Sequence, residues 1–155
     1  MKFKEDCIFC KIANKLIPAE IIEETDGFIV IKDMNPVAPI HLLIISKLHY
    51  DSVLDAGCKV DADKNSGDIS EEDGSKNKSN LSENYKSGDT ADDDDLEICG
   101  SGKELFGILG SLADKFNVAD KGFRTVINTK EDGGQTVNHL HIHFMAGRGF
   151  GWPPG

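Results

Sequence analysis

Three of the five histidines in this 155-residue chain stand at alternate positions of one short apolar run, HLHIHFM, at residues 139–145. Successive side chains of a β-strand point to opposite faces, so His139, His141 and His143 are predicted to line one face of a sheet. Imidazole is costly on an apolar face unless its nitrogens have partners. Two kinds of chemistry remain open for this strand: a zinc site, or a nucleophilic histidine with attendant hydrogen-bond donors.

The segment ahead of these histidines, DGGQT at residues 132–136, predicts a tight loop beside them. The backbone N–H groups of a glycine-bearing loop, with a hydroxyl next to them, can hold a phosphate oxygen. A Gly-Gly turn is common by itself. Joined to an H-x-H-x-H strand, it favours phosphate chemistry.

Cys7 and Cys10 form a C-x-x-C motif near the amino terminus. The first residues lack an apolar stretch of signal-peptide length, and no run approaches the ~20 apolar residues of a membrane helix, so we expect a cytoplasmic protein with no membrane partner. In a reducing compartment four cysteines indicate thiols or metal ligands, and this spacing favours zinc or redox chemistry. A zinc site needs two further ligands.

The length and the charge distribution predict one domain that contains an acidic insertion. The net charge is -10, but Lys59 to Glu97 holds thirteen acidic residues and five lysines, a balance of -8. The remainder is nearly neutral, and the overall acidity argues against nucleic-acid binding. Residues 57–100 are rich in Ser, Asp, Asn, Lys and Gly, which predicts a disordered, low-complexity insertion within a single domain of residues 1–155.

The segments outside this insertion predict an α+β fold. A helix capped by Asp6 is expected through Lys15, and Ser101 with Glu104 forms a capping box at the head of a second helix. That helix carries an apolar stripe on one side: Leu105, Ile108, Leu109, Leu112 and Phe116. A short helix is expected at 52–56, and strands at 20–24, 28–32, 41–46, 123–128 and 139–145. Together they predict a five-stranded antiparallel sheet with helices on one face.

Two long stretches resemble the histidine triad (HIT) family, in its Hint branch of histidine triad nucleotide-binding proteins. They are CIFCKIANKLIPAEIIEETDGFIVIKDMNPVAPIHLLIIS and DGGQTVNHLHIHFMAGRGFGWPPG. The family motif is His-φ-His-φ-His-φ-φ with φ apolar, and Leu140, Ile142, Phe144 and Met145 fill the apolar positions. The resemblance covers essentially the whole chain except the insertion.

The resemblance implies a nucleotide hydrolase. His141 would attack the α-phosphorus of a purine nucleoside phosphoramidate or related AMP-type nucleotide and give a nucleotidyl-histidine, which water then hydrolyses. Imidazole with a pKa of ~6.5 is a usable nucleophile at neutral pH. His143 would donate to the phosphate oxygens, and His41 would support it from behind. Further contacts to the phosphate or the leaving group are implied for Asn128, Gly134 and Thr136. Thr136 departs from the serine usual in the family, and Asn138 departs from an aromatic residue.

The front half of the chain would supply the nucleoside pocket. The resemblance implies an apolar wall for the base, formed by Phe9, Ile12, Ile17, Ile31 and Met34. It also implies that Asp33 accepts hydrogen bonds from the ribose hydroxyls. Ordinary core packing remains an alternative for the apolar set, and a turn cap remains one for Asp33.

The resemblance also implies a metal site and a partner. Some family members hold zinc with a C-x-x-C and two distant histidines, which here would be Cys7, Cys10, His49 and His139; four such ligands make a closed, structural site, and no catalytic metal is expected. The tail RGFGWPPG, with Trp152, would reach toward the second subunit of a homodimer. Two other functions stay open: a nucleotide-binding regulatory or scaffold protein with vestigial catalysis, and a metal-dependent hydrolase with zinc on the three triad histidines.

Overall fold

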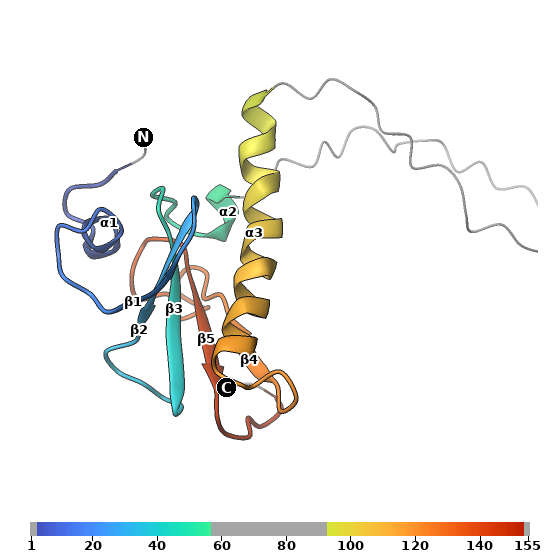
Figure 1. Cartoon of the computed structure of the whole chain (residues 1–155). Helices are drawn as coiled ribbons and strands as arrows, with labels where there is room; N and C mark the ends of the chain where they lie inside the picture. The colour runs from blue at the N-terminus through green and yellow to red at the C-terminus, as the bar shows by residue number, and fades with distance from the viewer. Residues whose placement is uncertain (1–2, 57–92, 154–155) are drawn as a thin grey trace, which may run out of the picture.

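The computed structural model describes residues 3–56 and 93–153, with residues 93–101 described by their backbone only. Five strands form one antiparallel sheet in the order β1-β2-β3-β5-β4 (Figure 1). Their bounds are Ile21–Glu24 (β1), Phe28–Lys32 (β2), Ile40–Ser46 (β3), Phe123–Val126 (β4) and His141–Ala146 (β5). The predicted five-stranded antiparallel sheet is therefore confirmed. Among the described residues, a helix with the length and apolarity to cross a membrane is not found.

The histidine strand β5 lies inside the sheet, between β3 and β4. Its residues pair with β3 through Ile45 opposite His141 and Leu43 opposite His143, and Val126 of β4 also stands opposite His143. Alternation along the strand is as predicted, because Ile142 and Phe144 are buried in the core on the other face. We call the face that carries His141 and His143 the histidine face.

The helices cover opposite faces of the sheet. The long helix α3 (Asp93–Lys115) packs Ile108 and Leu112 onto the face that holds Ile142 and Phe144. The short helix α1 (Ile8–Ala13) packs on the histidine face, in a second apolar cluster with Ile29, Ile31, Leu43 and Ile45 (Figure 1). The prediction that the helices share one face is wrong for α1.

Helix α3 begins ahead of the predicted capping box. Its backbone is helical from Asp93, so Ser101 does not start the helix. Oε1 of Glu104 instead accepts a hydrogen bond from the backbone N–H of Gly27 at 2.9 Å. Ser111 donates to Glu23 at 2.8 Å and Lys115 donates to the carbonyl of Ile22, so α3 is tied along β1. Of the predicted insertion, residues 57–92 lie outside the described residues and 93–100 belong to α3.

Three other boundaries differ from the prediction. Helix α1 follows Cys7 rather than Asp6, and Cys7 makes no side-chain cap hydrogen bond. Strand β4 ends at Val126, ahead of Asn128, and β5 begins at His141, so His139 lies in the bend that precedes the strand. The small helix α2 (Val53–Ala56) has a cap, because Leu54 donates its backbone N–H to the Ser52 hydroxyl at 3.3 Å.

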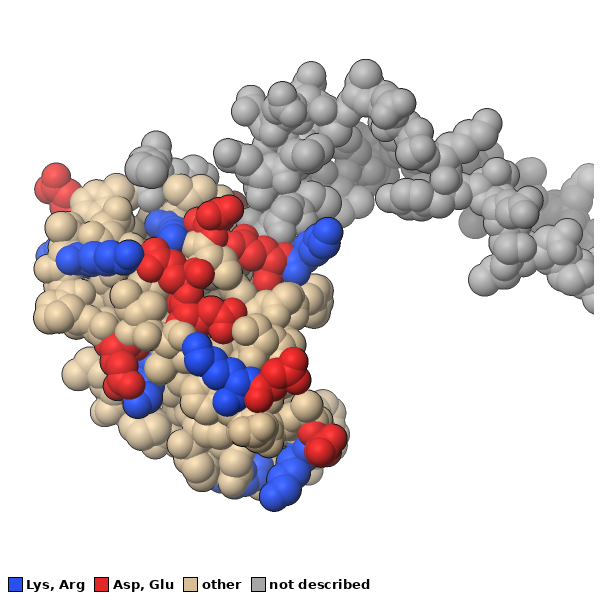
Figure 2. Space-filling model, viewed as in Figure 1, with Lys and Arg blue, Asp and Glu red and all other residues tan. Residues whose placement is uncertain are grey.

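The charged surface around the first hairpin is organised by ion pairs. Glu24 lies 3.0 Å from Lys15 and 2.9 Å from Lys47, and these two contacts lower the pKa of its carboxyl. Figure 2 shows acidic side chains gathered over this hairpin, with basic side chains interspersed and at the margins. Such exposed pairs contribute little to the free energy of unfolding, so the fold depends mainly on the two apolar clusters.

Candidate functional site

The chain's five histidines gather on the histidine face, four of them in two clusters and His141 between. We call Cys7, Cys10, His49 and His139 the cysteine–histidine cluster, and Asp33, His41 and His143 the aspartate–histidine cluster. In each, one ligand-type atom per residue lies within 4.8 Å of all the others.

The cysteine–histidine cluster has the dimensions of a tetrahedral zinc site. Nδ1 of His139 lies 3.4 Å from Sγ of Cys7 and 3.6 Å from Sγ of Cys10, while Nδ1 of His49 lies 3.2 Å from Sγ of Cys10. The two Nδ1 atoms are 3.1 Å apart. Zn–N and Zn–S bonds of ordinary length place ligand atoms about 3.3–3.8 Å from one another. The donor set and its spacing therefore fit zinc.

Hydrogen bonds fix which nitrogens of these two rings carry protons. Nε2 of His139 donates to the backbone carbonyl of Ser46 at 2.7 Å, and Nε2 of His49 donates to the carboxylate of Asp51 at 3.0 Å. Each neutral ring then has its lone pair on Nδ1, so two lone pairs face each other. Metal-binding histidines usually donate their second nitrogen to a carbonyl or a carboxylate in this way.

Burial acts on the same cluster. His139 and Cys10 are almost completely buried, at 0% and 1% exposure. Burial lowers the pKa of His139 to about 4 and raises the pKa of the Cys10 thiol. The His139 ring is therefore neutral near pH 7, which is the form that binds a metal ion.

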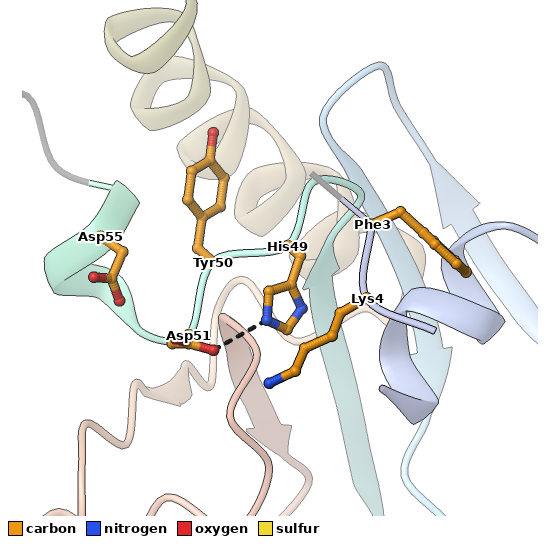
Figure 3. A pocket seen from close by; sticks show the side chains of 6 residues that line it. All are labelled: Phe3, Lys4, His49, Tyr50, Asp51 and Asp55. Carbon is orange, nitrogen blue, oxygen red and sulfur yellow. Dashed lines mark hydrogen bonds and ion pairs between the residues drawn. The ribbon is translucent and has the colours of Figure 1, made fainter. Parts of the chain in front are cut away.

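A cavity of about 440 Å³ lies on the outer side of His49 (Figure 3). The His49 side chain is 12% exposed and forms the open side of the cysteine–histidine cluster. Phe3 and Lys4 enter from the amino-terminal segment, and the remaining walls come from the segment after β3: Tyr50, Asp51 and Asp55. The cavity is not lined by any residue predicted for the base wall.

The predicted nucleophile, His141, has its proton fixed by the chain. Nδ1 lies 2.7 Å from the carbonyl oxygen of His139, and a carbonyl can only accept, so Nδ1 carries the hydrogen and Nε2 the lone pair. The ring is 4% exposed and packs against Phe9 at 5.1 Å between centroids. Every buried side-chain nitrogen or oxygen of the described residues has a partner, while Nε2 of His141 bonds to none of them. Nε2 is therefore not fully buried.

The aspartate–histidine cluster has the opposite proton arrangement. The backbone N–H of Val37 donates to Nδ1 of His41 at 3.2 Å, so a neutral His41 carries its proton on Nε2. That nitrogen lies 2.9 Å from Nδ1 of His143 and 3.4 Å from Oδ2 of Asp33. Because Nε2–H of His41 donates to Nδ1 of His143, a neutral His143 carries its own hydrogen on Nε2. Burial, then repulsion from charge on His141 and His41, lowers the pKa of His143, and Asp33 opposes this shift.

The predicted phosphate loop is closed upon itself. The N–H of Gly134, which has φ of +69°, donates to the carbonyl of Glu131 at 2.8 Å, so this amide is occupied. The Gln135 side chain accepts the N–H of Lys130 at 2.9 Å and donates to the carbonyls of Asp51 and Val137. Thr136 is exposed at the end of this loop, and Asn128 is half-buried just beyond β4.

The residues predicted for the nucleoside pocket are only partly gathered. Phe9 and Ile31 are buried in the apolar cluster under α1, and Ile12 packs against it. Ile17 is half-buried outside that cluster, and Met34 is 93% exposed. Oδ1 of Asp33 accepts the N–H of Asn35 at 2.7 Å, as a turn cap does, while its Oδ2 faces His41.

The three triad rings do not converge. His139 faces the cysteines, His143 faces His41, and His141 lies between them, so a zinc ion shared by all three is excluded. Sequence reasoning missed three partners that fix histidine rings of the site: Val37 for His41, Ser46 for His139 and Asp51 for His49. It also missed Gln135, whose side chain donates to the backbone carbonyl of Asp51. Asp51 had a signal in its spacing two residues after His49. The groups of Val37 and Ser46 that matter are backbone atoms, which leave no mark in a sequence.

Comparison with known proteins assigns this fold and motif to a family. A HIT domain model matches residues 89–150, and a model described as "Scavenger mRNA decapping enzyme C-term binding" matches residues 6–65. An uncharacterized HIT-like protein of Synechococcus elongatus is 34% identical over 151 residues, 97% of this chain and 98% of that one. The protein thus belongs to the HIT family.

Two further relatives bear on the site. A "14 kDa zinc-binding protein" of Brassica juncea is 29% identical over 150 residues, covering 97% of this chain and all of that one. The crystal structure of a HIT family hydrolase from Legionella pneumophila has a TM-score of 0.66 and 30% identity, over 97% of this chain and 100% of that one.

Proposed function

We propose that the protein is a nucleotide hydrolase of the Hint kind, which cleaves the P–N bond of purine nucleoside phosphoramidates. The observation that carries this proposal is the Nδ1 hydrogen bond of His141, which leaves an unprotonated Nε2 as the nucleophile. Hydrolysis is also the activity named for the Legionella relative. A phosphorus atom presented to Nε2 would meet its lone pair directly, so the attack needs no separate base.

The reaction has two displacements at phosphorus. The bond from Nε2 of His141 to the α-phosphorus forms as the bond to the leaving amine breaks, and the amine departs with a proton drawn from water. Water then attacks the same phosphorus, and the nucleoside monophosphate leaves as His141 recovers its lone pair. Nε2–H of His143 stabilises the charge that develops on the phosphate oxygens. Thr136 and Asn128 are the remaining polar groups of the chain proposed to contact the phosphate. Gly134 would join them only if its N–H were released from the carbonyl of Glu131.

Substrate recognition is assigned to the front half of the chain. Phe9, Ile12 and Ile31 give an apolar surface beside His141, and Met34 and Ile17 would complete the wall for the base. Asp33 would exchange its contact with His41 for the ribose hydroxyls. The substrate that we propose is therefore a purine nucleotide.

We also propose that Cys7, Cys10, His49 and His139 bind one zinc ion. The ligand spacing, the two facing Nδ1 lone pairs and the name of the Brassica relative support it. Zinc bound there would cross-link α1 to the segment ahead of β5, a structural role. The free thiols of Cys7 and Cys10 suit a cytoplasmic, reducing location.

A homodimer is the third part of the proposal. Large apolar side chains are exposed on α3, on and beyond β4, and in the tail: Phe106 at 74%, Phe123 at 39%, Ile127 at 41% and Trp152 at 88%. A second copy of the chain would cover such a surface. Sedimentation of the purified protein measures it directly.

The test of the enzymatic proposal is release of AMP from adenosine 5′-phosphoramidate. The wild-type protein is expected to release AMP and to form a labelled nucleotidyl adduct that peptide mass analysis places on His141. His141→Ala is expected to abolish turnover while AMP affinity changes by less than about tenfold, because only the nucleophile is lost. Nucleotide binding without AMP release by the wild type would instead identify a regulatory protein.

A further inference from the structure

His139 contacts the cysteine–histidine cluster through its ring and the proposed nucleophile, His141, through its backbone carbonyl. Its ring Nδ1 faces Cys7 at 3.4 Å and Nδ1 of His49 at 3.1 Å. Its Nε2 donates to the carbonyl of Ser46 at 2.7 Å. Its own carbonyl oxygen accepts Nδ1–H of His141, also at 2.7 Å. A shift of the His139 ring is therefore transmitted through two bonds of side chain to the acceptor that fixes the proton of His141.

The sheet does not hold this acceptor in place. The paired residues of β5 start at His141, and His139 lies in the bend of residues 137–139. Its N–H is used in a local contact with the carbonyl of Val137 at 2.8 Å. The peptide unit that carries this carbonyl is also held by the Leu140 N–H, which donates to the carbonyl of Tyr50 at 2.7 Å. Tyr50 directly follows the cluster residue His49, so both outside restraints on the His139 carbonyl, this bond and the ring contacts, lead back to the cysteine–histidine cluster.

An ion in the cysteine–histidine cluster changes the forces on that ring. Two nitrogen lone pairs 3.1 Å apart repel unless a cation lies between them. Thiol hydrogens are weak donors and relieve this contact poorly. A bound ion instead attracts both rings and both sulfurs, and it also fixes α1, whose Phe9 packs against His139 at 5.8 Å and His141 at 5.1 Å.

The consequence for His141 concerns which nitrogen keeps the lone pair. While the His139 carbonyl accepts at Nδ1, the proton stays there and Nε2 remains a nucleophile. If that carbonyl moves away, the neutral ring can place its proton on Nε2, where it blocks attack on phosphorus. We propose that His139 is a positioning residue that couples occupancy of the cysteine–histidine cluster by zinc to the nucleophilic form of His141. This inference rests on the proposed function for its kinetic part only.

The test compares zinc-loaded protein with protein stripped by a chelator under reducing conditions. Long-range proton–nitrogen correlation spectra identify which ring nitrogen of His141 carries the hydrogen. We expect the Nδ1–H form alone in the loaded protein and a mixture with the Nε2–H form in the stripped one. The rate of adduct formation should fall at least tenfold, AMP affinity should change less than about threefold, and zinc should restore both the spectrum and the rate.

A second variant covers the case in which stripped protein unfolds. Asp51→Asn weakens the acceptor that holds Nε2 of His49 and leaves His139 unchanged. Zinc affinity should therefore fall, so intermediate zinc occupancies can be set by the free zinc concentration. Circular dichroism reports whether the protein stays folded at each occupancy. Asp55→Asn is the matched control, because Asp55 lines the same cavity but, within the described part of the chain, its carboxylate bonds to Ser52 and not to His49. The Nδ1–H fraction of His141 is expected to follow zinc occupancy in Asp51→Asn and to remain at the wild-type value in Asp55→Asn.

A His141 ring that keeps the pure Nδ1–H form in folded protein at every zinc occupancy would overturn the coupling. The spectra do not require turnover, so they decide the coupling even in a protein without phosphoramidase activity. Conversely, loss of the proposed function would appear as zinc-loaded protein that has the Nδ1–H form and yields no adduct.

Discussion

The two histidine clusters are built from similar residues but direct their protons in opposite ways. In the cysteine–histidine cluster, the outer nitrogen of each ring donates to an oxygen, from Ser46 or Asp51, and the lone pairs point inward. In the aspartate–histidine cluster, His41 receives a backbone N–H from Val37 and passes its own proton toward His143. The first cluster presents lone pairs and so fits a cation, whereas the second presents a hydrogen and so fits an anion such as phosphate.

This difference shows that ligand identity alone does not define a metal site. Asp33, His41 and His143 are as close together as the zinc-type set, and by composition they resemble a metal triad. A metal on Nε2 of His41 would require a hydrogen on Nδ1, where the N–H of Val37 already points. The proton donors around each ring therefore make the first cluster suited to a cation such as zinc and the second suited to an anion such as phosphate.

The largest expected effect is on the free energy of unfolding. The same experiment tests the difference between the two clusters, because that difference would be lost if both clusters bound metal. Cys10→Ser should remove the single zinc ion counted by mass spectrometry. At free zinc a thousand times the Kd, the wild type should gain about 4 kcal/mol of unfolding free energy over its stripped form, and Cys10→Ser should gain little. Asp33→Asn is the control and should keep one zinc per chain. Two ions per wild-type chain would contradict the assignment.

The next effect is on catalysis and sharpens the role of the second cluster. His41→Phe removes the donor to Nδ1 of His143 and should lower kcat for phosphoramidate hydrolysis on the order of 10²-fold, comparable to the loss of one transition-state donor. His41→Gln keeps an amide donor and should lose less. Steady-state kinetics measure both, with the zinc count unchanged. Equal losses in the two variants would argue against a relayed donor.

The smallest effect is on pH dependence. The lowered pKa of His143 means that, as pH falls through its unfolded value of ~6.5, the unfolded chain binds a proton that the folded chain does not, so this residue makes stability decrease with acidification. Asp33→Asn removes the charge that favours the imidazolium and should lower the pKa further. A nuclear magnetic resonance titration of the His143 ring gives the value. A rise of that pKa in Asp33→Asn would refute the electrostatic role of Asp33.

Much of this fold follows from local patterns, because they reflect burial. The alternation in HLHIHFM placed Ile142 and Phe144 in the core, and the spacing of Ile108 and Leu112 predicted the buried side of α3. The face covered by α1 was missed, since an amphipathic helix does not say which side of a sheet it will meet. The late start of β5 was missed because Leu140 bonds to the carbonyl of Tyr50, a contact set by the whole fold.

For the candidate site, the side chains could be predicted from the sequence but the positions of their protons could not. The pattern of Cys7, Cys10 and the histidines indicated which side chains would meet, and the family resemblance supplied His49. The proton positions were not predictable, because they depend on backbone groups at residues 37, 46 and 139 that any amino acid would supply. The occupied amide of Gly134 was also missed, since a glycine loop alone does not show whether its donors are satisfied internally.

The contacts that tie α3 along β1 make the two margins of the sheet unequal. Glu104, Ser111 and Lys115 bond to the first hairpin, and their helix lies over that side. A strand protected in this way is a poor template for an additional strand. At the other margin, the tail contacts β4 through a side chain, because Arg124 donates to the carbonyl of Gly151 at 2.6 Å. Since α3 instead reaches backbone atoms of the first hairpin, at Ile22 and Gly27, extension of the sheet by a neighbouring backbone would be directional and would favour the β4 margin.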